Sequence, residues 1–359
     1  MAAKHMRGKV QTVLGPIGAE DLGVTLTHEH LLVIASGAFK APVDPDLRRK
    51  ALEPVGYGNV GWVRYHPLLS KDNLELSDES VAIEEALRFR VAGGRTIVDM
   101  TNASTGRDPA VLARIARATG LNIVMGTGCY TEATIPEPAR RGLTEDRLTE
   151  TMVRELEAGV ADTGIRAGVI GEIGMDWPIT DFERMSLRAA VRAQQHTGSP
   201  MNVHSGKSPS AQFEIVRLLE EGKADLSRVC VAHIDSRVFD WHIAADLAKS
   251  GVYLGYDSFS LEGWYDTRLV LSEDNPVVCD IPNDAGRLND ILSLVHQGFI
   301  KQILISHDHC MKHRMYRWGG PGYAHIPENV VPLMRRKGFN EEQIHTILVE
   351  NPKRLMQLA

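Results

Sequence analysis

The run GVTLTHEHLLV, residues 23–33, is rich in β-forming residues and carries two histidines in its second half. The same arrangement, an apolar run with a polar residue at its end and then an amphipathic stretch, recurs along the chain. The later runs are residues 94–101, 121–128, 165–174, 200–206, 228–235, 251–258 and 301–308. Strands that alternate with helices form a parallel sheet, and eight of them close a (β/α)8 barrel. The sequence therefore predicts an α/β protein with a single TIM-barrel domain over residues 1–359.

The stretches between these runs have apolar residues at helical spacing. They are residues 78–92, 180–195, 210–221, 236–249 and 284–297, and Ser77 is the expected N-cap of the first. Pro352 interrupts the last stretch, residues 340–358, so two short helices are expected there. A doubly wound open sheet is the alternative fold, but no GxGxxG motif follows the first run.

Several segments exceed a minimal barrel. Residues 8–15 predict a strand or hairpin before the first barrel strand. Residues 32–76, 258–281 and 310–323 predict long loops that follow the first, seventh and eighth strands. Because such loops lie on the catalytic face of a barrel, we expect them to form the walls of a substrate pocket.

Composition excludes several classes of protein. The chain has 43% hydrophobic and 24% charged residues, which is ordinary for a globular protein. Its 40 basic and 46 acidic residues give a net charge of −6, which does not favour binding to nucleic acid or a membrane surface. Neither a signal peptide nor a membrane span is expected. The four cysteines form no CxxC pair, which favours a reduced, cytoplasmic setting over a disulfide scaffold.

The polar ends of the runs predict a metal site. His28 and His30 share one face of a strand, although two hydrogen-bonded histidines are an equally good interpretation. Glu172 lies in AGVIGEIG, where a carboxylate is costly to bury without a cation or good hydrogen bonds. Pairing with an arginine, or a position at the strand end, is the alternative for Glu172.

His204, His233 and Asp308 end three further runs, so all six side chains fall at one rim of the barrel. Four imidazoles and two carboxylates suffice for two divalent cations with Glu172 as the bridge, and mixed nitrogen and oxygen ligands suit Zn²⁺, with Mn²⁺, Co²⁺ or Fe²⁺ as alternatives. On the eighth strand, His307 or His309 could replace Asp308 as the ligand. We prefer Asp308, because a carboxylate beside a bound water can orient it and accept its proton.

The chain resembles the phosphotriesterase family of the amidohydrolase superfamily, especially its phosphotriesterase-related branch. The matching segments are GKVQTVLG, LTHEHL, GVIGEIG, NVHSG, VAHID, ISHD, GGPGYAHI and ENPKRL, which span almost the whole chain. The resemblance implies a barrel with a binuclear metal centre at the strand ends. His28, His30 and Asp308 would hold one metal, His204 and His233 the other, with a hydroxide between them.

One departure from the founding members concerns the bridging ligand. Those members use a carboxylated lysine, whereas the matching strand here offers Glu172, as in the phosphotriesterase-related branch. The substitution weakens any inference of organophosphate hydrolysis. The resemblance implies that the bridging hydroxide attacks the carbonyl of a lactone or amide, with Asp308 as proton shuttle. A phosphoric triester hydrolase and a non-catalytic ligand-binding relative that keeps the metal site are the alternatives.

Substrate-binding residues are less sharply marked. Tyr130 matches a position where related lactonases place a tyrosine beside the substrate, although a tyrosine of the core or a loop is an equal alternative. Lys207, Arg268 and the basic loop 312–318 could form a patch for a small anionic substrate, or be solvated. Arg268 is the first choice because Trp264 and Tyr265 lie close to it in the chain. Asp257 and Asp235 are expected to support ligands rather than bind metal. The resemblance is compatible with a homodimer.

Overall fold

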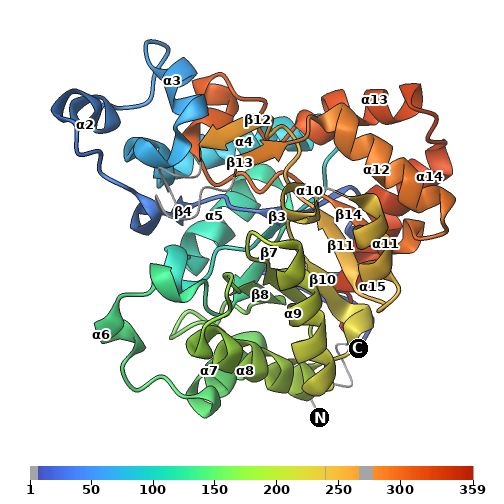
Figure 1. The fold of residues 1–359 in the computed structure, drawn as a ribbon. Coiled ribbons are helices and arrows are strands. Elements are labelled where there is room, and N and C mark those ends of the chain that lie inside the picture. Colours follow the sequence, from blue (N-terminus) through green and yellow to red (C-terminus); the bar gives the residue numbers. More distant parts are fainter. Residues whose placement is uncertain (1–6, 239, 267–277, 359) are drawn as a thin grey trace.

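A computed structural model describes residues 7–238, 240–266 and 278–358 (Figure 1). Eight parallel strands form the central sheet in the order β14–β11–β10–β9–β8–β7–β6–β3. The strands are β3 (Thr25–Glu29), β6 (Thr96–Asp99), β7 (Asn122–Thr127), β8 (Val169–Gly174), β9 (Met201–His204), β10 (Val229–Val231), β11 (Tyr253–Tyr256) and β14 (Ile303–Ile305). Each lies within one of the eight runs expected from the sequence, so the prediction of an eight-stranded parallel sheet is confirmed.

The two end strands of the sheet, β3 and β14, meet along a seam that brings the sheet close to a closed barrel. Side chains make part of this seam: the Ser306 hydroxyl accepts a hydrogen bond from His28 N at 3.0 Å and lies 2.8 Å from the His28 carbonyl. The Asp308 N–H donates to the same carbonyl at 3.1 Å. The seam therefore fixes the end of β3 against the segment that follows β14.

The alternation of side chains along each strand explains the two apolar cores. On β10, Val229 and Val231 belong to the large core between the strands and the helices. Cys230, between them, belongs to the small core together with Val98 and Leu304 from other strands. Because successive side chains of a strand point to opposite faces, the small core fills the barrel and the large core surrounds it.

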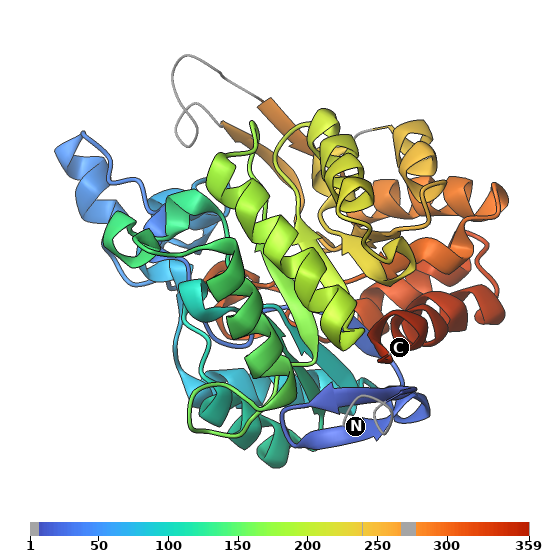
Figure 2. The ribbon, with the colours of Figure 1, turned by 90° about the horizontal axis from the view of Figure 1, so that it is seen from below.

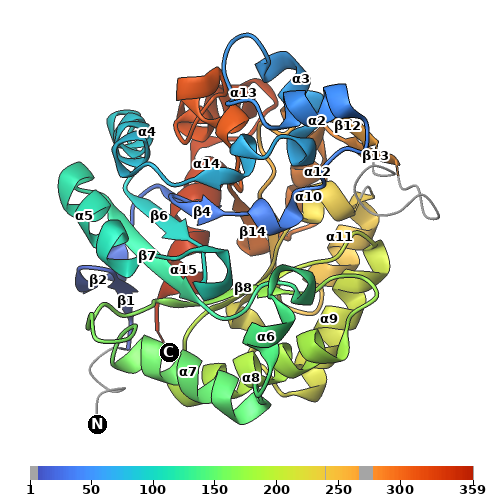
Figure 3. The same cartoon turned by 90° about the vertical axis from the view of Figure 1, so that its left-hand side faces the viewer.

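Helices surround the strands, as Figure 3 shows. They are α4 (Glu79–Val91), α5 (Pro109–Thr119), α7 (Glu145–Glu157), α8 (Asp181–Thr197), α9 (Pro209–Glu221), α11 (Trp241–Ala248), α12 (Asp284–His296) and α13 (Val331–Arg336). The N-cap of α4 is Asp78, whose carboxylate accepts from Ser80 N, so the expectation of Ser77 was wrong by one residue. Within the described residues, no helix has the length and apolar character that a bilayer crossing requires.

Two of the expected helices differ in detail. The stretch 236–249 contains the end of α10 (Ile234–Arg237) and a separate helix α11, because Asp240 caps α11 and Val238 is extended. At the carboxyl end, a π-helical turn joins α14 (Glu341–His345) to α15 (Asn351–Met356). Pro352 lies in the first turn of α15, where a missing N–H is tolerated. The helix is therefore not broken at Pro352.

A hairpin covers the end of the barrel at which the strands begin. It consists of β1 (Lys9–Thr12) and β2 (Gly15–Gly18), which pair antiparallel, so the hairpin expected near the amino terminus is confirmed. Gly168 permits its close approach, since a Cβ there would lie 2.2 Å from the Gln11 carbonyl oxygen. Figure 2 shows this hairpin beside the carboxyl end of the chain.

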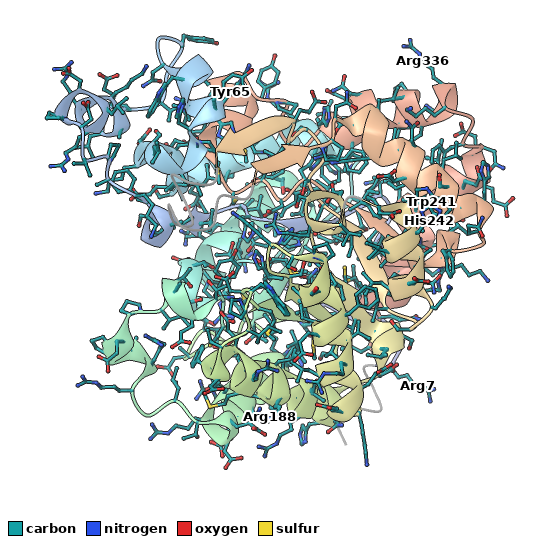
Figure 4. The ribbon with its side chains drawn as sticks, viewed as in Figure 1. Arg7, Tyr65, Arg188, Trp241, His242 and Arg336 are labelled. Carbon is teal, nitrogen blue, oxygen red and sulfur yellow. The ribbon has the colours of Figure 1, made fainter. Side chains whose placement is uncertain are left out.

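The opposite end of the barrel carries the long loops. The segment after β3 pairs β4 (Val33–Ile34) with β5 (Glu75–Leu76) and adds α2 (Pro45–Ala51) and α3 (Val60–Tyr65) at the edge of the molecule (Figure 1). Tyr65, at the end of α3, is exposed (Figure 4). The loop after β11 contains an antiparallel hairpin that sequence analysis did not distinguish from a loop.

That second hairpin is formed by β12 (Gly263–Asp266) and β13 (Val278–Ile281). The loops after the first and eighth strands also contact each other. Lys312 Nζ lies 2.6 Å from the Asp72 carboxylate, and Arg64 Nη2 donates to the Gly319 carbonyl at 2.6 Å. These contacts join two loops that are far apart in the sequence into one wall beside the strand ends.

Candidate metal centre

The six predicted ligands come together at the carboxyl ends of the barrel strands. Those on or just beyond β3 and β14 lie at the seam, and the others lie on β8, on β9 and just beyond β10. They are His28, His30, Glu172, His204, His233 and Asp308. Since parallel strands all end at the same rim, side chains on five strands, or within three residues of their ends, reach one point.

Glu172 lies at the centre of this cluster. Its Oε1 atom is 2.7 Å from His204 Nδ1, 3.0 Å from His233 Nε2 and 3.5 Å from His28 Nε2. The side chain is 4% exposed. Burial alone would raise the pKa of Glu172, but the surrounding His204 and His28 rings hold it well below its usual value. The carboxylate is therefore ionised and shared among histidines of three strands.

Asp308 completes a second group at the seam. Its Oδ1 atom is 3.2 Å from His30 Nε2 and 3.8 Å from His28 Nε2. The backbone of Asp308 is left-handed, with φ of 52°, a conformation that aspartate and asparagine tolerate better than most residues. The donor atoms of the six predicted ligands thus form two groups, one of His28, His30 and Asp308 and one of Glu172, His204 and His233, while a third group joins His28 and His233 to Asp257.

The donor chemistry fits divalent cations. His28 Nε2 is buried and makes no hydrogen bond, although the Glu172 and Asp308 carboxylates lie within 4 Å of it. A buried ring nitrogen that faces two carboxylates in this way is suited to coordinate a metal. Imidazole nitrogens together with carboxylate oxygens match the preferences of Zn²⁺ and related cations. Both groups of donors could therefore hold a metal ion.

Asp257, at the end of β11, orients two of the histidines from behind. Its carboxylate lies 2.8 Å from His233 Nδ1 and 3.0 Å from His28 Nδ1, which leaves both Nε2 atoms facing the cluster. Burial opposes a charged ring, but Asp257 and Glu172 raise the pKa of His233 to about 9. A carboxylate on the far nitrogen of a ligand histidine fixes the orientation of its ring. The expected supporting role of Asp257 agrees with these contacts.

Asp235 does not support the cluster as expected. Its carboxylate accepts from Arg287 Nε at 2.6 Å and from Ser258 N at 3.0 Å. Arg287 is fully buried and also pairs with Asp284 at 2.9 Å. Asp235 is therefore part of an ion network that holds the loop after β11. It lies in the short helix α10, which begins directly after His233, and not on a strand.

His307 and His309 flank Asp308 but do not belong to its group of donors; all three lie beyond the end of β14, and Asp308 has a left-handed backbone. The partner of the two histidines is Glu29, which sequence analysis did not single out. This fully buried carboxylate accepts from His307 N at 2.9 Å, His307 Nδ1 at 2.7 Å and His309 N at 3.0 Å. The sequence signal was alternation along β3: in His28-Glu29-His30, the middle side chain must point to the face opposite its neighbours.

Of the predicted substrate residues, the structure places Tyr130 at the cluster. Its hydroxyl is 3.2 Å from His204 Nδ1. Burial raises the pKa of Tyr130 well above its usual value, so the hydroxyl stays protonated. Lys207 is half-buried three residues after His204, and Trp264 belongs to β12. Arg268 lies outside the described residues.

The basic loop 312–318 was one part of the expected patch with Lys207 and Arg268, and several of its cations have partners within the protein. Lys312 pairs with Asp72, and Arg317 lies 3.5 Å from Glu84. Arg314 donates to the Asp308 carbonyl at 3.0 Å and to the Phe259 carbonyl at 2.8 Å. These cations stabilise the loop wall, which the order of residues within the loop could not reveal.

A cation that sequence analysis missed lies on the other side of the cluster. Arg237, the last residue of α10, is half-buried and hydrogen bonds to the backbone of Ser205 and Ser236. Those two serines follow His204 and His233 closely in the chain. Only the helical turn after His233 brings Arg237 to this position, and the strand pattern alone does not predict such a turn.

Comparisons with known proteins agree with this geometry. The model of the phosphotriesterase family matches residues 8–356. An N-acetyltaurine hydrolase of Salmo salar is 40% identical over 350 residues, which cover 97% of this chain and 98% of that protein. A resiniferatoxin-binding protein from Rhodobacter sphaeroides has a TM-score of 0.91 at 35% identity, covering 98% of this chain and 96% of the other. A lactonase from Listeria monocytogenes has a TM-score of 0.77 at 26% identity, with coverage of 98% and 99%.

Proposed function

This chain is a hydrolase that belongs to the phosphotriesterase family, and from that premise we propose that it uses two divalent cations to hydrolyse the amide bond of a small, anionic N-acyl amine. N-acetyltaurine, the compound named for the salmon relative, is the first candidate substrate. That relative matches nearly the whole chain at 40% identity, whereas the similar lactonase is 26% identical. The higher identity favours an amide over a lactone.

The observation that carries the proposal is the position of Glu172 between the two groups of donors. Its Oε1 atom lies within 3.5 Å of histidine nitrogens from β3, β9 and β10. His28, His30 and Asp308 would hold one cation, His204 and His233 the other, and Glu172 both. Cations held there would lower the pKa of a bound water and polarise a carbonyl group.

The remaining steps use side chains at the open edge of the cluster. Asp308 is 25% exposed, whereas His28, Glu172 and Asp257 are each below 5%. It is therefore the carboxylate that is placed to orient the attacking water and to carry its proton to the leaving amine. The protonated Tyr130 hydroxyl beside His204 can donate a hydrogen bond to the substrate.

Metal content and a substrate panel test this proposal together. We expect elemental analysis of unchelated protein to find about two equivalents of metal per chain, because the donors form two groups. Hydrolysis of N-acetyltaurine should disappear on chelation and return with Zn²⁺ or Mn²⁺. The panel should also contain N-acetyl amino acids, lactones and a phosphotriester.

The outcomes separate the alternatives. A lactone cleaved with higher kcat/KM than any amide would replace the proposal with a lactonase, and a phosphotriester cleaved faster would replace it with an ester hydrolase. Less than one metal per chain, with no turnover after reconstitution, would favour a ligand-binding protein.

A further inference from the structure

An enzyme that prefers anionic amides needs a cation beside its cluster, and the basic loop after β14 does not provide one. Lys312 is paired with Asp72, and Arg314 donates from both Nη atoms to carbonyls of the chain. Arg237 lies on the opposite side, across the ends of β9 and β10. Arg237 contacts the backbone next to His204, whereas the loop cations contact Asp72 and the backbone of the loops.

Arg237 is held in place through two of its three guanidinium nitrogens. Its Nε is 3.4 Å from the Ser205 carbonyl, and its Nη1 is 3.1 Å from the Ser236 carbonyl and 3.2 Å from the Ser236 hydroxyl. Ser205 directly follows His204, so these contacts anchor the guanidinium within one residue of a predicted ligand. The anchoring leaves the plane of the group ordered before any ligand arrives.

The bonding of Arg237 leaves its charge available to a ligand. Within the described residues, no carboxylate pairs with it and its Nη2 atom makes no hydrogen bond. Two buried arginines of the chain, Arg107 and Arg287, pair with the carboxylates of Glu155 and Asp235. The buried Arg314 has no carboxylate partner either, but both of its Nη atoms donate to backbone carbonyls, whereas one Nη atom of Arg237 does not. A half-buried guanidinium without such a partner is well suited to bind an oxyanion, which accepts charge-assisted hydrogen bonds.

We propose that Arg237 binds the anionic end of the substrate and thereby selects N-acyl amines that carry a sulfonate or carboxylate. The inference rests on the proposed function: the amide carbonyl faces the ligand cluster while the anion lies over the ends of β9 and β10. Tyr130 lies next to His204, the ligand at the end of β9. Arg237 is then a specificity-determining residue rather than a member of the metal site.

A matched pair of substrates tests this role. N-acetyltaurine and N-acetylethanolamine share the acetamide group, but only the first carries a sulfonate. For the first substrate, we expect Arg237→Ala to lower kcat/KM about 10- to 100-fold, mostly through KM, because a charge-assisted hydrogen bond is lost. The second substrate should change by about twofold or less. Arg237→Lys should recover part of the loss, and an N-acyl amino acid shows whether a carboxylate is accepted.

The control variant is Arg188→Ala. Arg188 projects from the outer side of α8, is 55% exposed and pairs with Glu145 (Figure 4). This variant removes one positive charge at a distance, and both substrates should be cleaved as by the wild type. Any loss shared by the two arginine variants would reflect the overall charge of the protein and would contradict a local role of Arg237.

Other outcomes would also overturn the inference. If Arg237→Ala lowers kcat/KM equally for both substrates, or loses metal, the residue only supports the backbone near His204. If it leaves N-acetyltaurine hydrolysis unchanged, it does not bind the anion. If the wild type cleaves neither substrate, the proposed function fails. Calorimetric titration with taurine then tests anion binding by Arg237 on its own. Binding by the wild type but not by Arg237→Ala supports the inference, and no binding refutes it.

Discussion

The rim of the barrel has two parts that are built differently. In the ligand cluster, each side chain lies at the end of a barrel strand, and Glu172 contacts histidines from three different strands. In the loop wall, residues 310–319 are held by residues 64–73, mainly through Lys312 with Asp72 and the hydrogen bonds of His313 to Asn73. The first part depends on the barrel, and the second on contacts between loops.

This difference has consequences for mutation. The backbone of the cluster is fixed by the strand ladder and by two apolar cores, so replacing a donor changes chemistry more than folding. The wall has fewer ladder hydrogen bonds, so replacing a buried polar residue there should change stability more than chemistry. Variants in each part can confirm or refute this division.

The largest effect is expected for Glu172→Gln. The amide keeps the shape of the side chain but removes the charge that lies 2.7 Å from His204 and 3.0 Å from His233. Loss of a supporting residue typically lowers metal affinity or activity 10- to 100-fold, and loss of a bridging ligand should exceed about 100-fold. Elemental analysis should show that at least one metal is lost. A variant with two metals and full turnover would show that Glu172 does not bridge.

A loss of activity without the loss of a metal is expected for Asp308→Asn. Asparagine tolerates the left-handed backbone at this position, so the fold and most of the metal should be retained. Removal of the group that carries the proton should lower kcat about 10²- to 10⁴-fold. Circular dichroism and metal analysis serve as controls. Unchanged kcat would mean that another residue carries the proton to the leaving group.

The cluster was predictable because its geometry follows from the fold. Once the eight runs are assigned to a barrel, the polar residue at the end of each run must lie at one rim. Strand alternation then separates His28 and His30 from Glu29. Even the supporting role of Asp257 follows from its position at the end of the seventh run.

The parts that were missed depend on local turns or on distant partners. Arg237 reaches the site through the short helix α10, and strand periodicity carries no information about such a turn. The cations of the loop 312–318 are paired with residues 84 and 72, and no sequence spacing links these positions. The expected helix break at Pro352 does not occur, because Pro352 lies in the first turn of α15. That position depends on the preceding π turn, which the sequence pattern does not predict.

The seam between β3 and β14 is a third kind of site, because a carboxylate there supports both the barrel and the cluster. Glu29→Ala would leave the His307 ring and the N–H groups of His307 and His309 without their partner. Removal of one partner from such a buried network should cost about 3–5 kcal/mol in the free energy of unfolding. Glu29→Gln keeps an acceptor for His307 and should cost less. Urea unfolding measures both, and a cost below about 1 kcal/mol for alanine would show that the seam does not need Glu29.

The smallest effect tests the loop wall by pH. Burial and the nearby Arg314 lower the pKa of His313 to about 3, whereas the unfolded chain takes up the proton near pH 6.5. Between these values, only the unfolded state binds the proton, so stability from this residue is lost as the pH falls, by about 1.4 kcal/mol per pH unit. His313→Asn retains a donor for Asn73 and should remove this part of the acid sensitivity. Urea unfolding at pH 7 and pH 5 measures the free energy of unfolding of both proteins. From pH 7 to pH 5, the wild type should lose about 2 kcal/mol more of this free energy than the variant does. A difference that is the same at both pH values would mean that His313 contributes only its contacts, and that acid does not act on the wall through this residue.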